Sequence, residues 1–167
     1  CLPLFSKAGS DYAVKHVMDA FNKRPAMTQI YASYLAKFLH QEEVAAFLFE
    51  RAKDGGLVDW QRMWTLATLL QLPEAEDEGV KVAMSILKAG DRHEALRAVA
   101  AIFVGRFGDH SRRKALVAYY GSVTPYIQTA IYFSSRRWPG VERSNAKATW
   151  GSHGVLNSLL TAALGKK

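Results

Sequence analysis

Apolar residues recur with helical spacing along almost the whole chain, and this periodicity limits the chain to a helical fold. Leu96, Val99, Ala100 and Phe103, for example, follow the i, i+3, i+4, i+7 spacing that places side chains on one face of a helix. The strict alternation of apolar and polar residues that is typical of strands is missing. Glycine and proline separate the periodic segments, as they do where helices end. We therefore predict an all-α fold.

The predicted helices recur at a nearly constant distance along the chain. Placing Arg62, Arg97 and Gln128 in register gives offsets of 35 (97 − 62) and 31 (128 − 97) residues. A second set of helices, aligned on Lys81 and Lys114, is offset by 33 residues (114 − 81). Such a period is typical of a repeated helix pair whose stacked copies bury a continuous core. The repeat predicts an α-α superhelix, that is, a solenoid.

We count about four helix pairs and expect a capping helix at each end, because a terminal repeat cannot bury its own face. The caps are expected around residues 11–23 and 152–164. The second helix of the last pair is expected near residues 142–150 and is shorter and polar. All of residues 1–167 are expected to form a single domain.

Individual residues mark helix starts and the core. Thr124, followed by a proline, is expected to be an N-cap, and Asp91 stands three residues before Glu94 as in a capping box. Asp109 follows a glycine and is expected to be an ordinary turn residue. Residues on the predicted core stripes include Met27, Ile30, Trp60, Met63 and Trp64.

The segment 94–109 carries the clearest family resemblance. Its sequence, EALRAVAAIFVGRFGD, is similar to the first-helix signature of HEAT and HEAT-like repeats, with small residues at the packing points and a Gly-Asp turn. The other repeats match only in pattern, and aromatic residues such as Trp64 and Tyr132 replace the usual aliphatic ones. The resemblance implies a HEAT/ARM-like solenoid of divergent repeats.

A second resemblance concerns residues 31–35 (YASYL), the helix from residue 60 to 64, and residues 126–130 (YIQTA) before 134–138 (SSRRW). Together they resemble the C-terminal helical domain of some bacterial RNA-directed DNA polymerases (reverse transcriptases). This resemblance implies an accessory domain in a longer protein whose polymerase active site lies upstream of Cys1. It carries no catalytic residue over to this chain.

Positive charge is concentrated in the second half of the sequence. Residues 1–90 hold 10 Lys/Arg and 11 Asp/Glu, net −1, whereas residues 91–167 hold 12 and 4, net +8. Arginine matches phosphate oxygens and aromatic rings stack on bases, so this composition favours nucleic-acid binding. The predicted nucleic-acid-binding residues are Arg106, Arg112, Arg113, Lys114, Arg136, Arg137, Trp138, Arg143 and Lys147.

A structural explanation competes with this one, because arginines at helix C-termini complement the macrodipole. Arg106 and the pair 136–137 fit such positions. Aromatic residues that interleave with the basic ones, and so are candidates for stacking on bases, are Tyr119, Tyr120, Trp138 and Trp150. Trp60 and Trp64, in contrast, are expected to be packing residues.

No arrangement of residues points to catalysis or to a bound metal. The five histidines have no ligand-like spacing, Cys1 is the single cysteine, and a glycine-rich phosphate loop is missing. The acidic run 74–78 is interpreted as favouring a helix N-terminus. We expect no catalytic residue, no metal and no cofactor.

The longest apolar run, residues 98–104, is far too short to cross a bilayer, and the start of the chain does not have the form of a signal peptide. With one cysteine the chain makes no internal disulfide, which is typical of a reducing compartment. We expect a soluble cytoplasmic protein without membrane contact.

The function predicted from these observations is a non-catalytic helical-repeat accessory domain that binds DNA or RNA, or that positions a protein partner or an upstream domain of the same chain. A protein-protein interaction scaffold is the first alternative. A HEAT-like DNA glycosylase is the second, although the acids of the basic half stand next to no evident aromatic cleft. These acids are Asp91, Glu94, Asp109 and Glu142.

Overall fold

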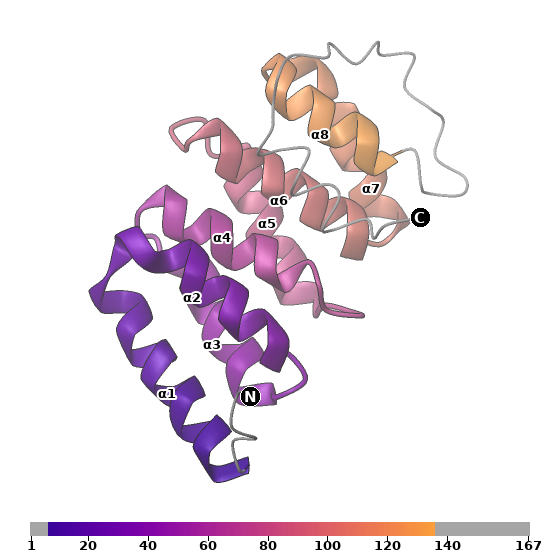
Figure 1. Ribbon diagram of the computed structural model, residues 1–167. Coiled ribbons are helices and arrows are strands. Elements are labelled where there is room, and N and C mark those ends of the chain that lie inside the picture. The colour runs from indigo at the N-terminus through magenta and orange to yellow at the C-terminus, as the bar shows by residue number, and fades with distance from the viewer. Residues whose placement is uncertain (1–6, 136–167) are drawn as a thin grey trace. The chain divides into compact units, whose positions relative to one another are not determined.

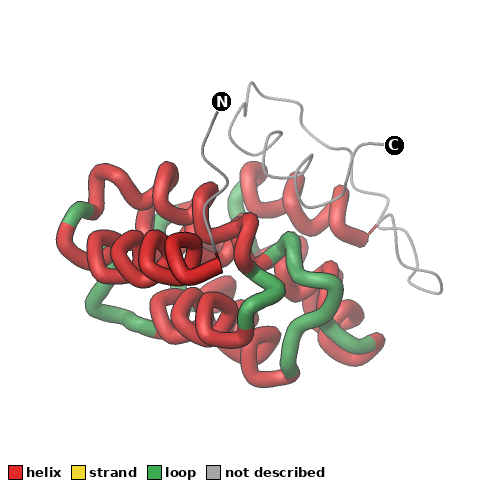
Figure 2. Tube along the Cα trace, turned by 60° about the horizontal axis from the view of Figure 1, so that its bottom comes forward, coloured by secondary structure: helices red, strands yellow, loops and turns green. Residues whose placement is uncertain are grey.

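The computed structural model describes residues 7–135, and every regular element in this range is a helix (Figure 2). The predicted all-α class is therefore confirmed for this part of the chain. The predicted helices around 142–150 and 152–164 lie outside the described residues. Two compact units divide the chain, residues 1–69 (the N-terminal unit) and residues 70–167 (the C-terminal unit).

The N-terminal unit contains α1 (Lys7–Lys23), η1 (Pro25–Met27), α2 (Thr28–Leu35), η2 (Ala36–Phe38), α3 (Glu42–Lys53) and α4 (Asp59–Leu69) (Figure 1). Helices α2 and α3 both pack against α4, and α1 packs against α2. The helix expected around residues 11–23 is present as α1. It ends before Pro25, whose ring fixes φ and which has no N–H to continue the helical bonds.

The C-terminal unit contains α5 (Asp77–Lys88), α6 (Glu94–Phe107), α7 (His110–Ala118), η3 (Tyr119–Ser122) and α8 (Pro125–Ser135) (Figure 1). Helix α6 packs against α5, α7 and α8. Every residue from Leu96 to Gly105 is buried. A helix that is apolar on all sides belongs in a core, and α6 is the core helix of this unit.

One contact recurs at the start of α4 and of α6. The Nε of Arg62 donates a hydrogen bond to the carbonyl of Ala52 at 3.0 Å, and the Nε of Arg97 donates to the carbonyl of Leu87 at 3.0 Å. Each acceptor is the next-to-last residue of the preceding helix, where carbonyls have no partner within the helix. A buried arginine therefore ties the second helix of each pair to the end of the first.

The third position of the predicted register makes a related contact. The side-chain amide of Gln128, in α8, donates to the carbonyl of Tyr120, in η3, at 3.2 Å. A glutamine amide retains one of the donor functions that arginine offers. At residues 62 and 97 the predicted register corresponds to the same hydrogen bond, and at residue 128 it corresponds to a related one.

One of the two predicted helix caps is wrong. The N-cap of α6 is His93, whose Nδ1 accepts a hydrogen bond from the amide of Ala95 at 3.1 Å, and not Asp91. Thr124 does directly precede α8, which begins at Pro125, and its carbonyl accepts from the amide of Gln128 at 2.9 Å, although its buried hydroxyl makes no hydrogen bond in the described part of the chain. Cap identity depends on the backbone path into the helix, which sequence spacing alone does not specify.

Part of the predicted core is also wrong. Trp60 is 45% exposed and Ile30 59% exposed, and Met27 is exposed as well. The ring of Trp60 packs edge-on against Trp64 at 5.5 Å between centroids, in the first turn of α4. The buried residues of α2 are Thr28, Ala32 and Leu35.

The buried hydroxyl of Thr28 has a hydrogen-bond partner. It donates to the carbonyl of Pro25 at 2.7 Å. A hydroxyl that already has a partner is buried at little cost. A polar residue therefore occupies the core position that apolar periodicity assigned to its neighbours.

Candidate nucleic-acid interface

The structure places four of the predicted nucleic-acid-binding residues at one corner of the C-terminal unit. Arg106 lies in the last turn of α6, and Arg112, Arg113 and Lys114 lie near the start of α7. We call these four residues the α6–α7 corner. The remaining predicted residues lie outside the described part of the chain: Arg136, Arg137, Trp138, Arg143 and Lys147.

Gly108 and Asp109 shape this corner. The amide of Gly108 donates to the carbonyl of Val104 at 2.8 Å, and a Cβ at residue 108 would overlap that same carbonyl oxygen. Asp109 is the N-cap of α7, and its Oδ1 accepts from the amide of Arg112 at 2.8 Å. The expected role of Asp109 as a turn residue is confirmed. The close turn brings the basic end of α6 next to the basic start of α7.

Arg112 lies between two carboxylates from different helices. Its Nη1 forms an ion pair with Asp109 Oδ2 at 3.2 Å and a second, closer one with Asp77 Oδ1. Asp77 is the first residue of α5 and also pairs with the Nζ of Lys81 at 3.0 Å. The hydrogen bond from Lys81, followed by that from Arg112, holds the pKa of Asp77 below its ordinary value despite partial desolvation.

Backbone carbonyls hold two other members of the corner in place. An Nη2 of Arg106 donates to the carbonyl of Leu72 at 3.1 Å, and its guanidinium lies 5.2 Å from the ring centre of Phe107. The Nη2 of Arg113 donates to the carbonyl of Arg106 at 3.2 Å. One nitrogen of each guanidinium group is thus held by a backbone carbonyl.

Exposure distinguishes the four cations. Arg106 and Lys114 are exposed, whereas Arg112 and Arg113 are half-buried. Within residues 106–114 the sequence contains a single acid, Asp109, so this segment carries a net charge of +3 (4 − 1). A short cationic segment on a helix corner is suited to contact a phosphate backbone.

The aromatic residues expected to interleave with these cations contribute less surface. Tyr119 and Tyr120 are half-buried. Burial, with a smaller contribution from Tyr132, raises the pKa of Tyr120. Trp138 and Trp150 lie outside the described residues. Stacking on bases is therefore an expectation for residues 138 and 150 rather than an observed property of the corner.

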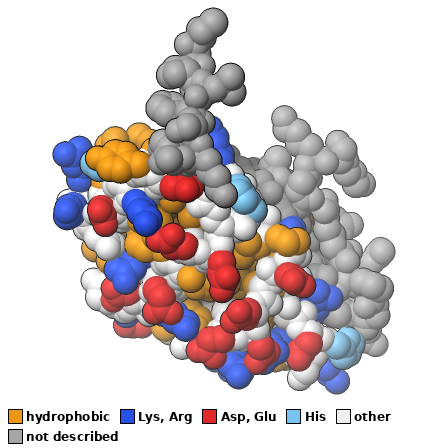
Figure 3. Space-filling model, turned by 90° about the horizontal axis from the view of Figure 1, so that it is seen from below, with side chains coloured by type: hydrophobic (Ala, Val, Ile, Leu, Met, Phe, Trp, Pro, Cys, Tyr) orange, Lys and Arg blue, Asp and Glu red, His pale blue; other side chains and the backbone are white. Residues whose placement is uncertain are grey.

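Most of the positive surplus lies beyond α8. Residues 70–135 hold 8 Lys/Arg and 7 Asp/Glu, net +1, while residues 136–167 hold 6 and 1, net +5. On the face of the molecule drawn in Figure 3, acidic and basic side chains are intermixed, with apolar side chains between them. The α6–α7 corner is thus a local concentration of charge in a nearly neutral segment.

The ion pair of Asp77 with Arg112 was not predicted from the sequence, where the acidic run 74–78 was interpreted only as favouring a helix N-terminus. A usable signal was present, since Asp77 and Arg112 are 35 residues apart (112 − 77), close to the repeat period. Opposite charges one period apart, at the starts of α5 and α7, are placed to meet when the helices stack. The observed ion pair has this arrangement.

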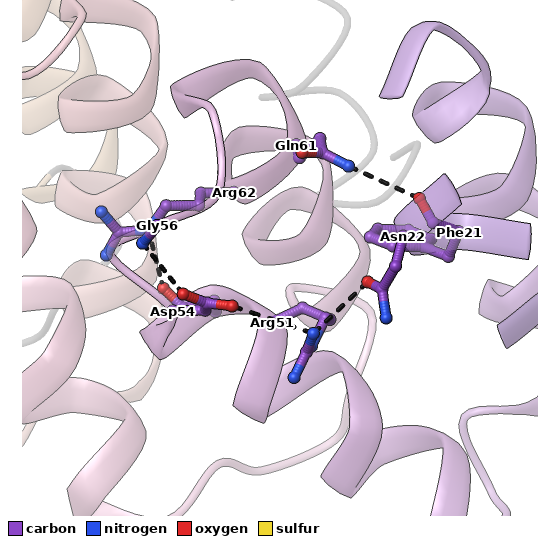
Figure 4. A network of polar contacts seen from close by, with 8 residues as sticks. Phe21, Asn22, Arg51, Asp54, Gly56, Gln61 and Arg62 are labelled. Atoms are coloured by element: carbon purple, nitrogen blue, oxygen red, sulfur yellow. Dashed lines mark hydrogen bonds and ion pairs between the residues drawn. The ribbon is translucent and has the colours of Figure 1, made fainter. Parts of the chain in front are cut away.

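The N-terminal unit has a polar network of its own (Figure 4). Arg51 contacts Asn22 at 3.4 Å and Asp54 at 3.8 Å, and the side chain of Gln61 donates to the carbonyl of Phe21 at 3.4 Å. The network joins the ends of α1 and α3 to the start of α4. Its residues therefore help to hold α1 and α3 against the start of α4.

Three further observations concern metal binding, the glycosylase alternative and membrane-spanning helices. Among residues 7–135, no three or more His, Cys, Asp or Glu side chains are grouped to hold a metal ion. Both carboxylate oxygens of Asp109, an acid considered for the glycosylase alternative, already accept hydrogen bonds from Arg112. No helix in the described range combines the length and the apolar character needed to cross a bilayer.

Comparison of the chain with protein-family models, with curated proteins and with solved structures found no match.

Proposed function

We propose that this chain is a non-catalytic helical-repeat domain that binds nucleic acid through the α6–α7 corner and the basic sequence after α8. The observation that carries the proposal is the gathering of Arg106, Arg112, Arg113 and Lys114 at one turn. Arginine and lysine contacts to phosphates supply most of the affinity in sequence-independent binding. The proposed ligand is the phosphate backbone of DNA or RNA.

The proposed architecture is a HEAT-like solenoid. In its favour, the buried arginines that tie a helix to the one before it are separated by one repeat period. Within each unit, moreover, helices pack against the next helix but one, α2 against α4 and α6 against α8. Both features are expected when successive helix pairs stack in the same orientation.

The proposed context is a C-terminal domain of a bacterial RNA-directed DNA polymerase. The resemblance of residues 31–35, 60–64 and 126–130 to such domains supports it. In that context the α6–α7 corner would hold template or product while an upstream domain performs the chemistry. The reading frame upstream of Cys1 tests this part of the proposal directly.

Binding to labelled DNA and RNA oligonucleotides at increasing salt tests the nucleic-acid proposal. We expect affinity to fall with salt, and Lys114→Glu to weaken binding and to reduce the slope of log K against log salt by about 1 or more. Lys88→Glu is the matched control, because Lys88 is an exposed lysine of the same unit that lies outside the corner. Binding that ignores salt, or equal effects of both variants, would contradict the proposal.

A protein-binding scaffold is the second candidate, and the exposed apolar residues of the N-terminal unit favour it. Trp60, Val58 and Ile30 are exposed although each is large and apolar. Exposed tryptophan is frequent at the centre of protein interfaces. If this function dominates, the binding of a protein partner captured from a lysate will persist after nuclease treatment. The Trp60→Ala variant will not capture that partner.

A further inference from the structure

Arg112 forms ion pairs with two carboxylates, that of Asp109 at the start of α7 and that of Asp77 at the start of α5. Both ion pairs use the same nitrogen, Nη1, and the side chain is 25% exposed. A guanidinium recognises phosphate with the same N–H groups that it presents to a carboxylate. A phosphate that approaches Nη1 therefore meets a position that Asp77 and Asp109 already occupy.

The two carboxylates are not equally replaceable. Asp109 belongs to the same helix start as Arg112, and its other oxygen is fixed as the N-cap of α7. Asp77 reaches Arg112 from α5, is itself 55% exposed, and has a second partner in Lys81. Lys81 remains available to Asp77 when Arg112 leaves. Asp77 is thus the partner that a phosphate can displace without loss of a helix cap.

We infer that Asp77 competes with nucleic-acid phosphates for Arg112, so that binding at the α6–α7 corner opens the ion pair between α5 and α7. This inference rests on the proposed function. An exposed ion pair is weak, and a polyanion that also contacts Arg106, Arg113 and Lys114 exchanges one partner for another. A ligand with a single phosphate has no such additional contacts and displaces Asp77 less readily.

The role of the competition is to set a threshold for binding. Asp77 lowers affinity for every phosphate ligand, but the loss matters most where few other contacts compensate. The acids Glu74, Glu76 and Glu78 are close to Asp77 in the sequence and add negative potential near it. Oligonucleotides long enough to span the corner are therefore selected over mononucleotides and inorganic phosphate.

The test compares Asp77→Asn with Glu74→Gln, which changes the net charge equally at an exposed residue nearby. With a fluorescein-labelled single-stranded oligonucleotide as the probe, we expect Asp77→Asn to bind about two- to fivefold more tightly than the wild-type chain. Glu74→Gln is expected to change affinity less. In the Arg112→Ala background, Asp77→Asn is expected to add nothing, because the competition has been removed.

Three outcomes would overturn the inference. Equal gains from Asp77→Asn and Glu74→Gln would show a general effect of charge, with the proposed function left intact. A gain from Asp77→Asn that persists without Arg112 would show that another cation is the target. Absence of salt-dependent binding by the wild-type chain would refute the proposed function itself. Thermal unfolding of each variant confirms that it is folded.

Discussion

In the helix pairs α3–α4 and α5–α6, Arg62 and Arg97 are only 5% and 8% exposed, whereas Arg106 at the end of α6 is exposed. The buried pair donates to carbonyls at the ends of preceding helices. The arginines of the α6–α7 corner lie on either side of a turn and make ion pairs or hydrogen bonds to carbonyls at the surface. One residue type thus has two roles, and burial distinguishes them.

The difference also limits what charge counting shows. Arg97 contributes to the net charge of +8 in residues 91–167, yet it is buried and bonded to Leu87. A phosphate cannot reach it without unfolding of the helix pair. We therefore expect substitutions of the buried arginines to change stability, and substitutions at the α6–α7 corner to change binding.

The largest expected effect is that of Arg97→Ala. Removing the side chain leaves the Leu87 carbonyl without its partner and creates a cavity, so the free energy of unfolding should fall by about 2–4 kcal/mol. Arg97→Gln should cost less, because Gln128 makes the related contact in the next pair. Urea denaturation provides the measurement. If Lys88→Ala, at an exposed residue of α5, costs as much, the distinction between buried and surface cations fails.

A smaller loss is expected from Gly108→Ala. The new Cβ would overlap the carbonyl oxygen of Val104 and press on the Cβ of Arg112, which costs about 1–3 kcal/mol. Gly121→Ala is the control, because a Cβ at residue 121 meets no atom within 4 Å. Thermal melts of both variants should separate clearly. Similar melting temperatures would mean that the corner adjusts its backbone easily and does not hold its cations in fixed positions.

The cap of α6 comes next in size. His93→Ala removes the acceptor for the Ala95 amide and should lower stability by about 1 kcal/mol. Asp91→Ala, at the position that spacing alone favours, should stay within about 0.5 kcal/mol of the wild-type chain. The pair of variants measures how much the helix that carries both Arg97 and Arg106 depends on its start. A larger effect of Asp91→Ala than of His93→Ala would support the capping box formed by Asp91 and Glu94 instead.

The smallest expected effect is the pH dependence of the Asp77 ion pairs. Because the fold lowers the pKa of Asp77, the pairs stabilise the protein above the ordinary carboxyl pKa of about 4 and this contribution is lost as pH falls through the lowered value. Wild type and Asp77→Asn should therefore differ slightly in melting temperature at neutral pH and converge in acid. The difference is small because Asp77 and Lys81 are exposed to water and Arg112 is only half-buried. A difference that grows in acid would contradict this assignment.

Features that depend on residues close together in the sequence could be predicted from the sequence. Helix existence follows from apolar spacing along one segment, and the break before Pro25 follows from the missing N–H of proline. The register of Arg62, Arg97 and Gln128 was visible because each residue contacts a carbonyl only eight to ten positions earlier. Asp109 was recognisable for the same reason, since its cap involves residue 112.

Only the tertiary structure decided which face of each helix is buried and which cations have partners. Ile30 and Thr28 lie in the same helix, and the packing of α2 against its neighbours buries the threonine while the isoleucine stays exposed. Likewise, the charge of Arg112 is known from the sequence, but its ion pair with Asp77 forms only when the starts of α5 and α7 lie close together. Burial and ion pairing depend on groups distant in sequence, so periodicity establishes the helices and packing determines what their surfaces can bind.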